Sequence, residues 1–140
     1  MKAKNACIAL FLLVMLMLIG LPSNRAVAAC YGSSCNGKDP VDEGCSGYTA
    51  TYRTLTGVAG RIQVQLRYSP GCNANWSRTI SLDQTKYLLA GLDNLGYGTA
   101  IYGGTVYSDM WNGGVVNCAY GGAKRILSAA WNPYGYAPCA

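Results

Sequence analysis

Apolar and polar residues alternate most regularly between residues 61 and 68. Four apolar or aromatic residues share one face of an extended chain: Ile62, Val64, Leu66 and Tyr68. Four polar residues share the other face: Arg61, Gln63, Gln65 and Arg67. A period of two residues is typical of a strand with one buried face. The pattern therefore predicts a β-strand over this segment.

The flanking segments predict an antiparallel neighbour on each side. Residues 49–55 are rich in threonine and tyrosine, and residues 56–60 contain two glycines that suit a hairpin loop. The Ser-Pro-Gly sequence at 69–71 predicts a turn that ends the second strand. A third strand is expected over residues 75–82. On that strand Trp76, Arg78, Ile80 and Leu82 share a face, and we interpret Arg78 as a discordant member near an edge.

The second half of the chain is divided by glycines into short runs. Residues 83–95 permit either a short helix or another strand. Strands are then expected over four runs: 97–102, 105–111, 115–120 and 124–131. Glycine pairs at 103–104, 113–114 and 121–122 predict hairpin turns between them. The fold class expected is all-β, mainly antiparallel, in a small disulfide-stapled barrel or sandwich with at most one short helix.

The N-terminal segment predicts an export signal. Lys2 and Lys4 precede an almost wholly apolar run over residues 6–21, and residues 26–28 have the small-x-small pattern that signal peptidase favours. We therefore expect a signal peptide over residues 1–28 and a single secreted domain over residues 29–140, without a membrane span in the mature form. The alternative is a lipid anchor on Cys30, because residues 27–30 also fit a loose lipobox.

The cysteines support the secreted prediction. The chain has seven, and Cys7 lies in the predicted signal peptide, so six remain: Cys30, Cys35, Cys45, Cys72, Cys118 and Cys139. An even count in a short exported domain predicts three disulfides. Residues 30–47, which we call the cysteine-rich arm, lack apolar periodicity and must be stapled to fold. Cys118 is the expected partner of Cys139, and the other four cysteines leave three pairings open. Lipidation of Cys30 would leave an odd number.

Charge and the absence of histidine narrow the function. Without the predicted signal peptide the chain has eight basic residues (11 minus 3) and six acidic ones, a net charge of +2 (8 minus 6). So small a charge does not indicate a nucleic-acid-binding surface. No histidine is present, which excludes triads built on histidine and the usual histidine-bearing zinc sites. We expect a non-catalytic monomer without a cofactor. A histidine-free hydrolase would have to use carboxylates from this set: Asp39, Asp42, Glu43, Asp83, Asp93 and Asp109.

Aromatic residues suggest a ligand class. All eleven tyrosines and three tryptophans follow the predicted signal peptide, and such rings combine an apolar surface with a polar edge. Core packing is the expected role of Trp76 and Trp111, which lie at strand-like positions. Trp131, Tyr134 and Tyr136 lie in an aperiodic tail and are the candidates for stacking on sugars. The function predicted is binding of a glycan or cell-wall polysaccharide at the cell envelope or outside the cell.

The cysteine-rich arm supports two weaker hypotheses. An exposed rigid loop bearing Lys38 and Asp39 would suit a secreted inhibitor of an extracellular protein partner. Asp39, Asp42 and Glu43 are weak candidates for a Ca²⁺ site, because hard cations prefer several oxygen ligands in a loop. The alternative is local: Asp39 before a proline forms a turn, and Lys38 or Arg67 neutralises the other two carboxylates.

Three segments together resemble a known family. Residues 35–45, 67–76 and 106–111 are similar to the YjfA-like family of secreted bacterial domains of unknown function. The resemblance extends from Cys30 to about Ala119 and leaves the tail from Trp131 to Ala140 outside it. It implies an exported bacterial protein with a cysteine-bonded β domain, and it implies no catalytic residues.

Overall fold

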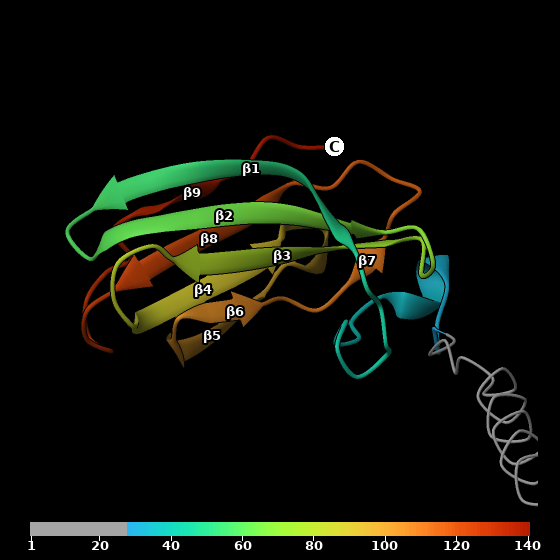
Figure 1. Cartoon of the computed structure of the whole chain (residues 1–140), viewed down its shortest axis with the longest axis horizontal. Helices are drawn as coiled ribbons and strands as arrows, with labels where there is room; N and C mark the ends of the chain where they lie inside the picture. Colours follow the sequence, from blue (N-terminus) through green and yellow to red (C-terminus); the bar gives the residue numbers. More distant parts are fainter. Residues whose placement is uncertain (1–27) are drawn as a thin grey trace, which may run out of the picture.

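The alternating segments form two antiparallel sheets that pack face to face (Figure 1). The structure, a computed structural model, describes residues 28–140. The predicted signal peptide lies outside the described residues except for Ala28. Within residues 28–140, none of the helices has the length and apolar character needed to cross a membrane.

The first sheet has five strands. In spatial order they are β1 (Tyr48–Gly57), β2 (Gly60–Ser69), β3 (Ala74–Ser81) and β6 (Thr105–Tyr107), and β7 (Trp111–Asn112) also pairs with β3. The second sheet has four strands, in the order β5 (Gly98–Gly103), β4 (Lys86–Leu92), β8 (Ala119–Lys124) and β9 (Tyr134–Tyr136). The fold is therefore a small β-sandwich, which confirms the predicted class and selects one of its two forms.

The inward faces of the two sheets enclose the main core. From β2 it contains Ile62, Val64 and Leu66, each fully buried, as the alternation predicts. The second sheet contributes small and branched apolar side chains: Leu88, Ala90, Leu92, Ala119 and Ala123. Alternate residues of every strand are thereby left on two outward faces, one for each sheet.

The third strand turns the opposite face to the core from the one that its apolar residues predict. In β3, Ser77 pairs with Leu66 and Thr79 with Val64, so these two polar residues face the core and are fully buried. Antiparallel pairing places direct partners on the same face, so the register with β2 decides the orientation of β3. Ser77 donates its hydroxyl hydrogen to the carbonyl of Tyr120 at 3.0 Å. The run that begins with Trp76 and Arg78 consequently lies on the outward face. Trp76 is nevertheless buried there, in a second apolar cluster with cysteines of the arm, so its expected core packing is confirmed.

Several expected boundaries in the second half also differ. Residues 86–92 form a strand, and only Asp93–Leu95 form a short 3₁₀ helix, η2. The Gly121–Gly122 pair lies inside β8 and is not a turn. A Cβ on Gly121 would lie 2.2 Å from Oγ1 of Thr79, so the close approach of the sheets requires glycine there. Gly103 and Gly104 join β5 to β6, which belong to different sheets, so they do not close a hairpin.

Two other expected strands are displaced. Of residues 115–120 only the last two are in a strand, and of residues 124–131 only Lys124 is. The tail instead supplies β9, which pairs Tyr136 with Tyr120 and Tyr134 with Gly122. The tail segment is extended because it pairs with β8, and the local sequence pattern does not reveal this pairing.

β1 contains a bulge. Thr49 pairs with Arg67 and Thr51 with Leu66, so Ala50 is an extra residue with no partner opposite it on β2. The bulge moves the strand from one alternation to the other. Thr49 therefore lies on the outward face beside Arg67, to which its hydroxyl oxygen is hydrogen bonded at 2.6 Å.

The cysteine-rich arm covers one end of the sandwich (Figure 1). It includes the 3₁₀ helix η1 (Gly32–Cys35) and is held by the Cys30–Cys35 and Cys45–Cys72 disulfides. The N–H of Gly37 donates to the carbonyl of Met110 at 3.0 Å, and the N–H of Met110 donates to the carbonyl of Lys38 at 2.8 Å. The third disulfide joins Cys118 to Cys139, as expected, and fastens the C-terminus beside the second sheet.

Candidate functional site

The outward face of the second sheet gathers tyrosines from four strands. Pairing places Tyr87 of β4 beside Tyr102 of β5, and Tyr120 of β8 beside Tyr136 of β9. Two residues complete the group, because Tyr134 and Trp131 both lie over Gly122. We call these six residues the tyrosine face: Tyr87, Tyr102, Tyr120, Trp131, Tyr134 and Tyr136. The three tail residues predicted to bind a ligand are thus brought together on one surface.

The rings of the tyrosine face pack against one another at their edges. The centroid of the Tyr120 ring lies 6.0 Å from that of Tyr134 and 5.8 Å from that of Tyr136. Tyr87 and Tyr102 form a second, T-shaped pair with centroids 5.0 Å apart. Such contacts restrict ring rotation, so much of the ordering needed for stacking exists before a ligand binds.

Glycines allow the rings to lie close to the sheet. A Cβ on Gly91 would lie 2.1 Å from Cζ of Tyr120, so that ring crosses β4 where a side chain is missing. A Cβ on Gly98 would lie 3.1 Å from the hydroxyl oxygen of Tyr120. Gly122 has the same role under Trp131 and Tyr134, with contacts of 3.2–3.3 Å. The result is an aromatic surface that lies close to the sheet.

The tyrosine face lies beside a positive charge, that of Lys124. Partial desolvation of its hydroxyl group, together with a hydrogen bond to Tyr136, raises the pKa of Tyr134 to about 12 although its ring is exposed, and burial raises the pKa of Tyr120. Both phenols are neutral near pH 7, as an unperturbed tyrosine is, and can take part in hydrogen bonds. The ammonium of Lys124 lies 4.5 Å from the centroid of the Trp131 ring and donates to the carbonyl of Leu127 at 2.5 Å.

A groove of about 240 Å³ lies on the opposite side, between the cysteine-rich arm and the outward face of the first sheet. The sheet contributes Arg67, Trp76, Arg78 and Tyr107 to its walls, and the arm contributes mainly small and apolar residues. We call this cavity the arginine groove. Its residues were not predicted as a site, although the Trp76 and Arg78 run is the signal in the sequence that indicates it.

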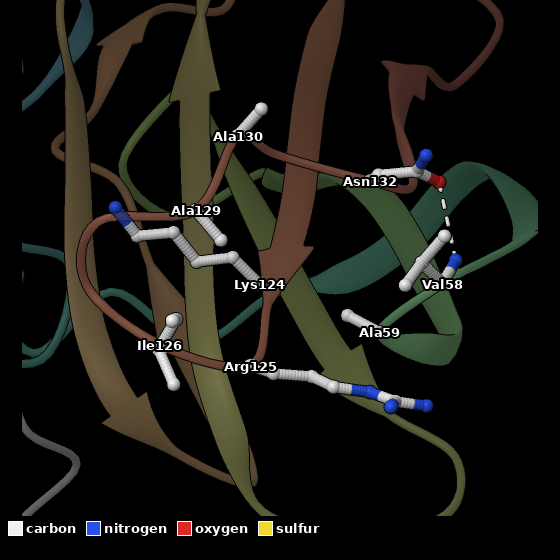
Figure 2. Close-up of a pocket in the computed structure, with 8 residues that line it drawn as sticks. All are labelled: Val58, Ala59, Lys124, Arg125, Ile126, Ala129, Ala130 and Asn132. Atoms are coloured by element: carbon white, nitrogen blue, oxygen red, sulfur yellow. Dashed lines mark hydrogen bonds between the residues drawn. The ribbon is translucent and has the colours of Figure 1, made fainter.

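A second cavity, of about 400 Å³, lies at the other end of the sandwich (Figure 2). It is lined by the β1–β2 turn, with Val58 and Ala59, and by the loop after β8, which includes Ile126. Two of its polar groups have partners: the carboxamide oxygen of Asn132 accepts from the N–H of Val58 at 3.2 Å, and the ammonium of Lys124 donates to the carbonyl of Leu127. Nothing in its lining selects a particular ligand.

The arm residues proposed as contacts have local partners. Asp39 accepts hydrogen bonds from the N–H groups of Val41 at 2.7 Å and Asp42 at 3.3 Å. Lys38, which is exposed, forms an ion pair with Glu43 at 3.4 Å. Among the described residues, the carboxylates proposed for Ca²⁺ do not form a set of three ligand atoms within 4.8 Å of one another.

The remaining acidic residues are separated in the fold. Lys86 is 2% exposed and bonds to the carboxylate of Asp83, and this hydrogen bond holds the pKa of that carboxyl well below its usual range. Asp109 accepts a hydrogen bond from the hydroxyl of Tyr97 at 2.8 Å. These contacts give Asp83 and Asp109 local structural partners, whereas within residues 28–140 the carboxylate of Asp93, in η2, has neither a hydrogen bond nor an ion pair.

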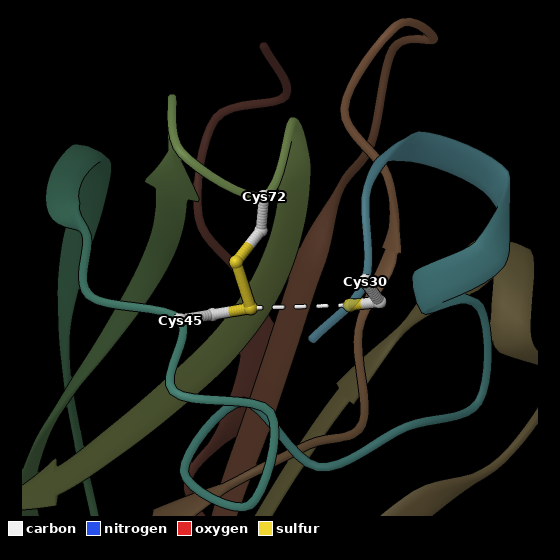
Figure 3. A group of neighbouring side chains, drawn as sticks. All are labelled: Cys30, Cys45 and Cys72. Carbon is white, nitrogen blue, oxygen red and sulfur yellow. Dashed lines mark hydrogen bonds between the residues drawn. A yellow bond between two sulfur atoms is a disulfide. The ribbon is translucent and has the colours of Figure 1, made fainter. Parts of the chain in front are cut away.

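Three cysteine sulfurs come close together where the arm is bonded to the chain before β3 (Figure 3). The Sγ atoms of Cys30, Cys45 and Cys72 lie within 4.8 Å of one another, and those of Cys30 and Cys45 are 4.0 Å apart. Each of these sulfurs is bonded in a disulfide. A cysteine has to be a thiolate to bind a metal ion. This cluster therefore serves to fasten the arm while the disulfides are intact.

Comparison with known proteins gives one match. Residues 33–123 match the sequence pattern of a family described as Protein of unknown function (DUF2690). No curated protein and no solved structure matches the chain.

Proposed function

The chain belongs to the DUF2690 family of proteins of unknown function, and from its structure we propose that it is a non-catalytic extracellular protein that binds a glycan of the cell envelope. The tyrosine face is the proposed binding surface. The observation that carries the proposal is the gathering of six aromatic side chains on one outward face: Tyr87, Tyr102, Tyr120, Trp131, Tyr134 and Tyr136. The bacterial origin implied by the YjfA-like resemblance is part of the same proposal.

The chemistry of this surface matches that of a sugar. A pyranose ring has apolar C–H faces and a rim of hydroxyl groups, and a tyrosine ring offers an apolar face with one hydroxyl. The phenols of Tyr120 and Tyr134 are neutral near pH 7, as those of unperturbed tyrosines are, and can donate to or accept from sugar hydroxyl groups. Tyr102, Tyr134 and Tyr136 are each exposed, so the apolar rings are accessible from solvent.

The extracellular setting rests on the cysteines. Three disulfides in a domain of this size are typical of oxidising compartments. Binding without catalysis is supported by the local engagement of Asp39, Asp83 and Asp109 in structural contacts. A stacking surface needs none of these carboxylates.

Co-sedimentation with purified peptidoglycan sacculi, followed by a glycan array, tests the proposal. The wild-type protein should sediment with sacculi or bind discrete glycans on the array. Tyr134→Ala should weaken this binding by roughly 2- to 10-fold, because an aromatic contact contributes about 0.5–1.5 kcal/mol. Trp131→Ala should act in the same direction.

Tyr52→Ala is the matched control. Tyr52 is also an exposed strand tyrosine, but it pairs with Gln65 and lies on the outward face of the first sheet. Its substitution should leave glycan binding unchanged, as should Lys38→Ala in the arm. Two results would contradict the proposal. One is that the wild-type protein binds neither the sacculi nor any glycan on the array. The other is an equal loss of binding in Tyr52→Ala and Tyr134→Ala.

A further inference from the structure

Strand pairing brings two arginines together in the arginine groove. Arg67 of β2 pairs with Trp76 of β3, and Arg78 of β3 pairs with Tyr107 of β6. Because all four belong to the outward alternation, the two guanidinium groups lie diagonally across neighbouring strands with Trp76 beside them. The guanidinium carbon of Arg78 lies 5.6 Å from the centroid of the Tyr107 ring.

Neither arginine is balanced by a carboxylate. The ion pairs among residues 28–140 are Lys38 with Glu43 and Lys86 with Asp83. Burial lowers the pKa of Arg67, and the charge of Arg78 lowers it further. Two like charges in a partly enclosed groove repel each other, so an anion placed between them would relieve an existing electrostatic cost.

Three N–H groups in the walls of the groove lack an acceptor. They are Nε of Arg67, Nε of Arg78 and Nε1 of Trp76, each of them buried and without a hydrogen-bond partner in the described part of the chain. Trp76 is only 3% exposed. Buried donors are normally paired, so a cluster of unpaired ones is unusual and indicates a missing acceptor.

A purely structural role accounts for one arginine but not for the other. Arg67 fastens the arm, because its terminal nitrogens donate to the hydroxyl oxygen of Thr49 and to the carbonyl of Gly47. Within residues 28–140, Arg78 makes neither a hydrogen bond nor an ion pair. Its outward neighbours Gln65 and Tyr107 supply packing but no negative charge.

We propose that the arginine groove binds the oxyanion group of a small ligand, a carboxylate or a phosphate. A guanidinium fork matches the two oxygens of either group and forms short, charge-assisted hydrogen bonds. The apolar part of the same ligand would lie against Trp76 and the arm residues Pro40 and Val41. The site lies on the opposite sheet from the tyrosine face, so it does not depend on the proposed glycan binding.

The indole N–H signals of Trp76, Trp111 and Trp131 in a ¹H–¹⁵N NMR spectrum provide the test. The full secreted domain is titrated separately with sodium acetate and with inorganic phosphate, at ionic strength held constant with sodium chloride. We expect a saturable shift of the Trp76 signal, with the Trp111 and Trp131 signals unmoved. A response to acetate alone assigns a carboxylate, a response to phosphate alone assigns a phosphate, and both responses assign a general oxyanion site.

Arg78→Gln should weaken binding of the responding anion by roughly tenfold or more, since it removes a charge-assisted partner. Arg78→Lys, which keeps the charge but loses the fork, should have an intermediate effect. Arg61→Gln is the matched control, because Arg61 lies on the neighbouring strand β2 and on the same outward face as Arg78, but is exposed at the other end of the sheet. Unmoved Trp111 and Trp131 signals verify that each variant is folded.

Two results would overturn the proposal. One is the absence of a saturable Trp76 shift with both anions. The other is an equal loss of affinity in Arg61→Gln and Arg78→Gln, which would reduce the effect to general attraction of anions by a basic protein.

Discussion

The two outward faces of this sandwich are built on the same type of sheet and present opposite chemistry. On the second sheet the outward positions are mainly tyrosines and glycines, with Leu89 and Lys124 among them, and they give an open aromatic surface. On the first sheet they include Arg67, Trp76 and Arg78, and the cysteine-rich arm folds over one end to make a groove. The comparison shows that strand pairing supplies the positions, while the side chains and an added loop decide whether the surface is open or enclosed in a groove.

The largest expected effect comes from removing the disulfide that holds the cysteine-rich arm. Replacing Cys45 and Cys72 by alanine should reduce the free energy of unfolding by about 2–5 kcal/mol and abolish the oxyanion response, because the arm loses its attachment to the start of β3. Glycan binding should persist at temperatures where the variant is folded. Thermal unfolding and the two binding assays measure this.

Replacing Cys118 and Cys139 by alanine should give the reciprocal result. This disulfide holds the chain after β9, so its loss should loosen Tyr134 and Tyr136 and weaken glycan binding while the oxyanion response remains. If both pairs of substitutions removed the same activity, the two faces would not be independent.

A second contrast lies between two adjacent glycines of β8. Gly121→Ala places a methyl group 2.7 Å from Cγ2 of Val64 in the core, and overpacking of this kind costs about 1–3 kcal/mol. In Gly122→Ala the contacts with Trp131 and Tyr134 are 3.2–3.3 Å, so stability should change less and glycan binding more. Denaturant unfolding and co-sedimentation of the two variants check this. Equal stability losses would show that the outer face is packed as tightly as the core.

The smallest expected effect is an alkaline one. The pKa of Tyr134 is about 12 in the folded protein, against about 10 for an unperturbed tyrosine. A raised folded pKa means that its contribution to stability is complete below about pH 10 and is lost as the pH rises towards about 12. The free energy of unfolding of Tyr134→Phe should therefore fall less steeply with pH over this range. Near pH 7 its dependence on pH should match that of the wild type. Denaturant unfolding of both proteins at a series of pH values tests this prediction. If the free energy of unfolding fell equally steeply in both proteins in the alkaline range, the result would count against burial of this phenol.

The strand with the clearest alternation could be predicted from the sequence, including its buried face. Ile62, Val64 and Leu66 are large and apolar at a period of two, and no tertiary contact has to be known to place them. The third strand could not be oriented in the same way, because its buried residues Ser77 and Thr79 are polar and small. Their position depends on the register with β2 and on space next to Gly121, both of which are long-range properties.

The candidate surfaces show the same limit. Trp131, Tyr134 and Tyr136 are near one another in sequence, so their common location could be anticipated. Tyr87 and Tyr120 join them only because β4 pairs with β8, which no local pattern reveals. The arginine groove depends in addition on where the arm folds. Arg78 was interpreted as an edge residue, whereas the structure places it at the centre of an outward face.

The bulge at Ala50 bears on how this molecule behaves at high concentration. β1 is the longest exposed edge of the first sheet, and an uninterrupted edge of ten residues would be a template for pairing with another chain. The extra residue breaks the spacing of free backbone donors and acceptors, and the charged side chain of Arg53 lies three residues further along the same edge. A neighbouring molecule could match only part of the strand in any one register, so the bulge protects the native fold from edge-to-edge aggregation.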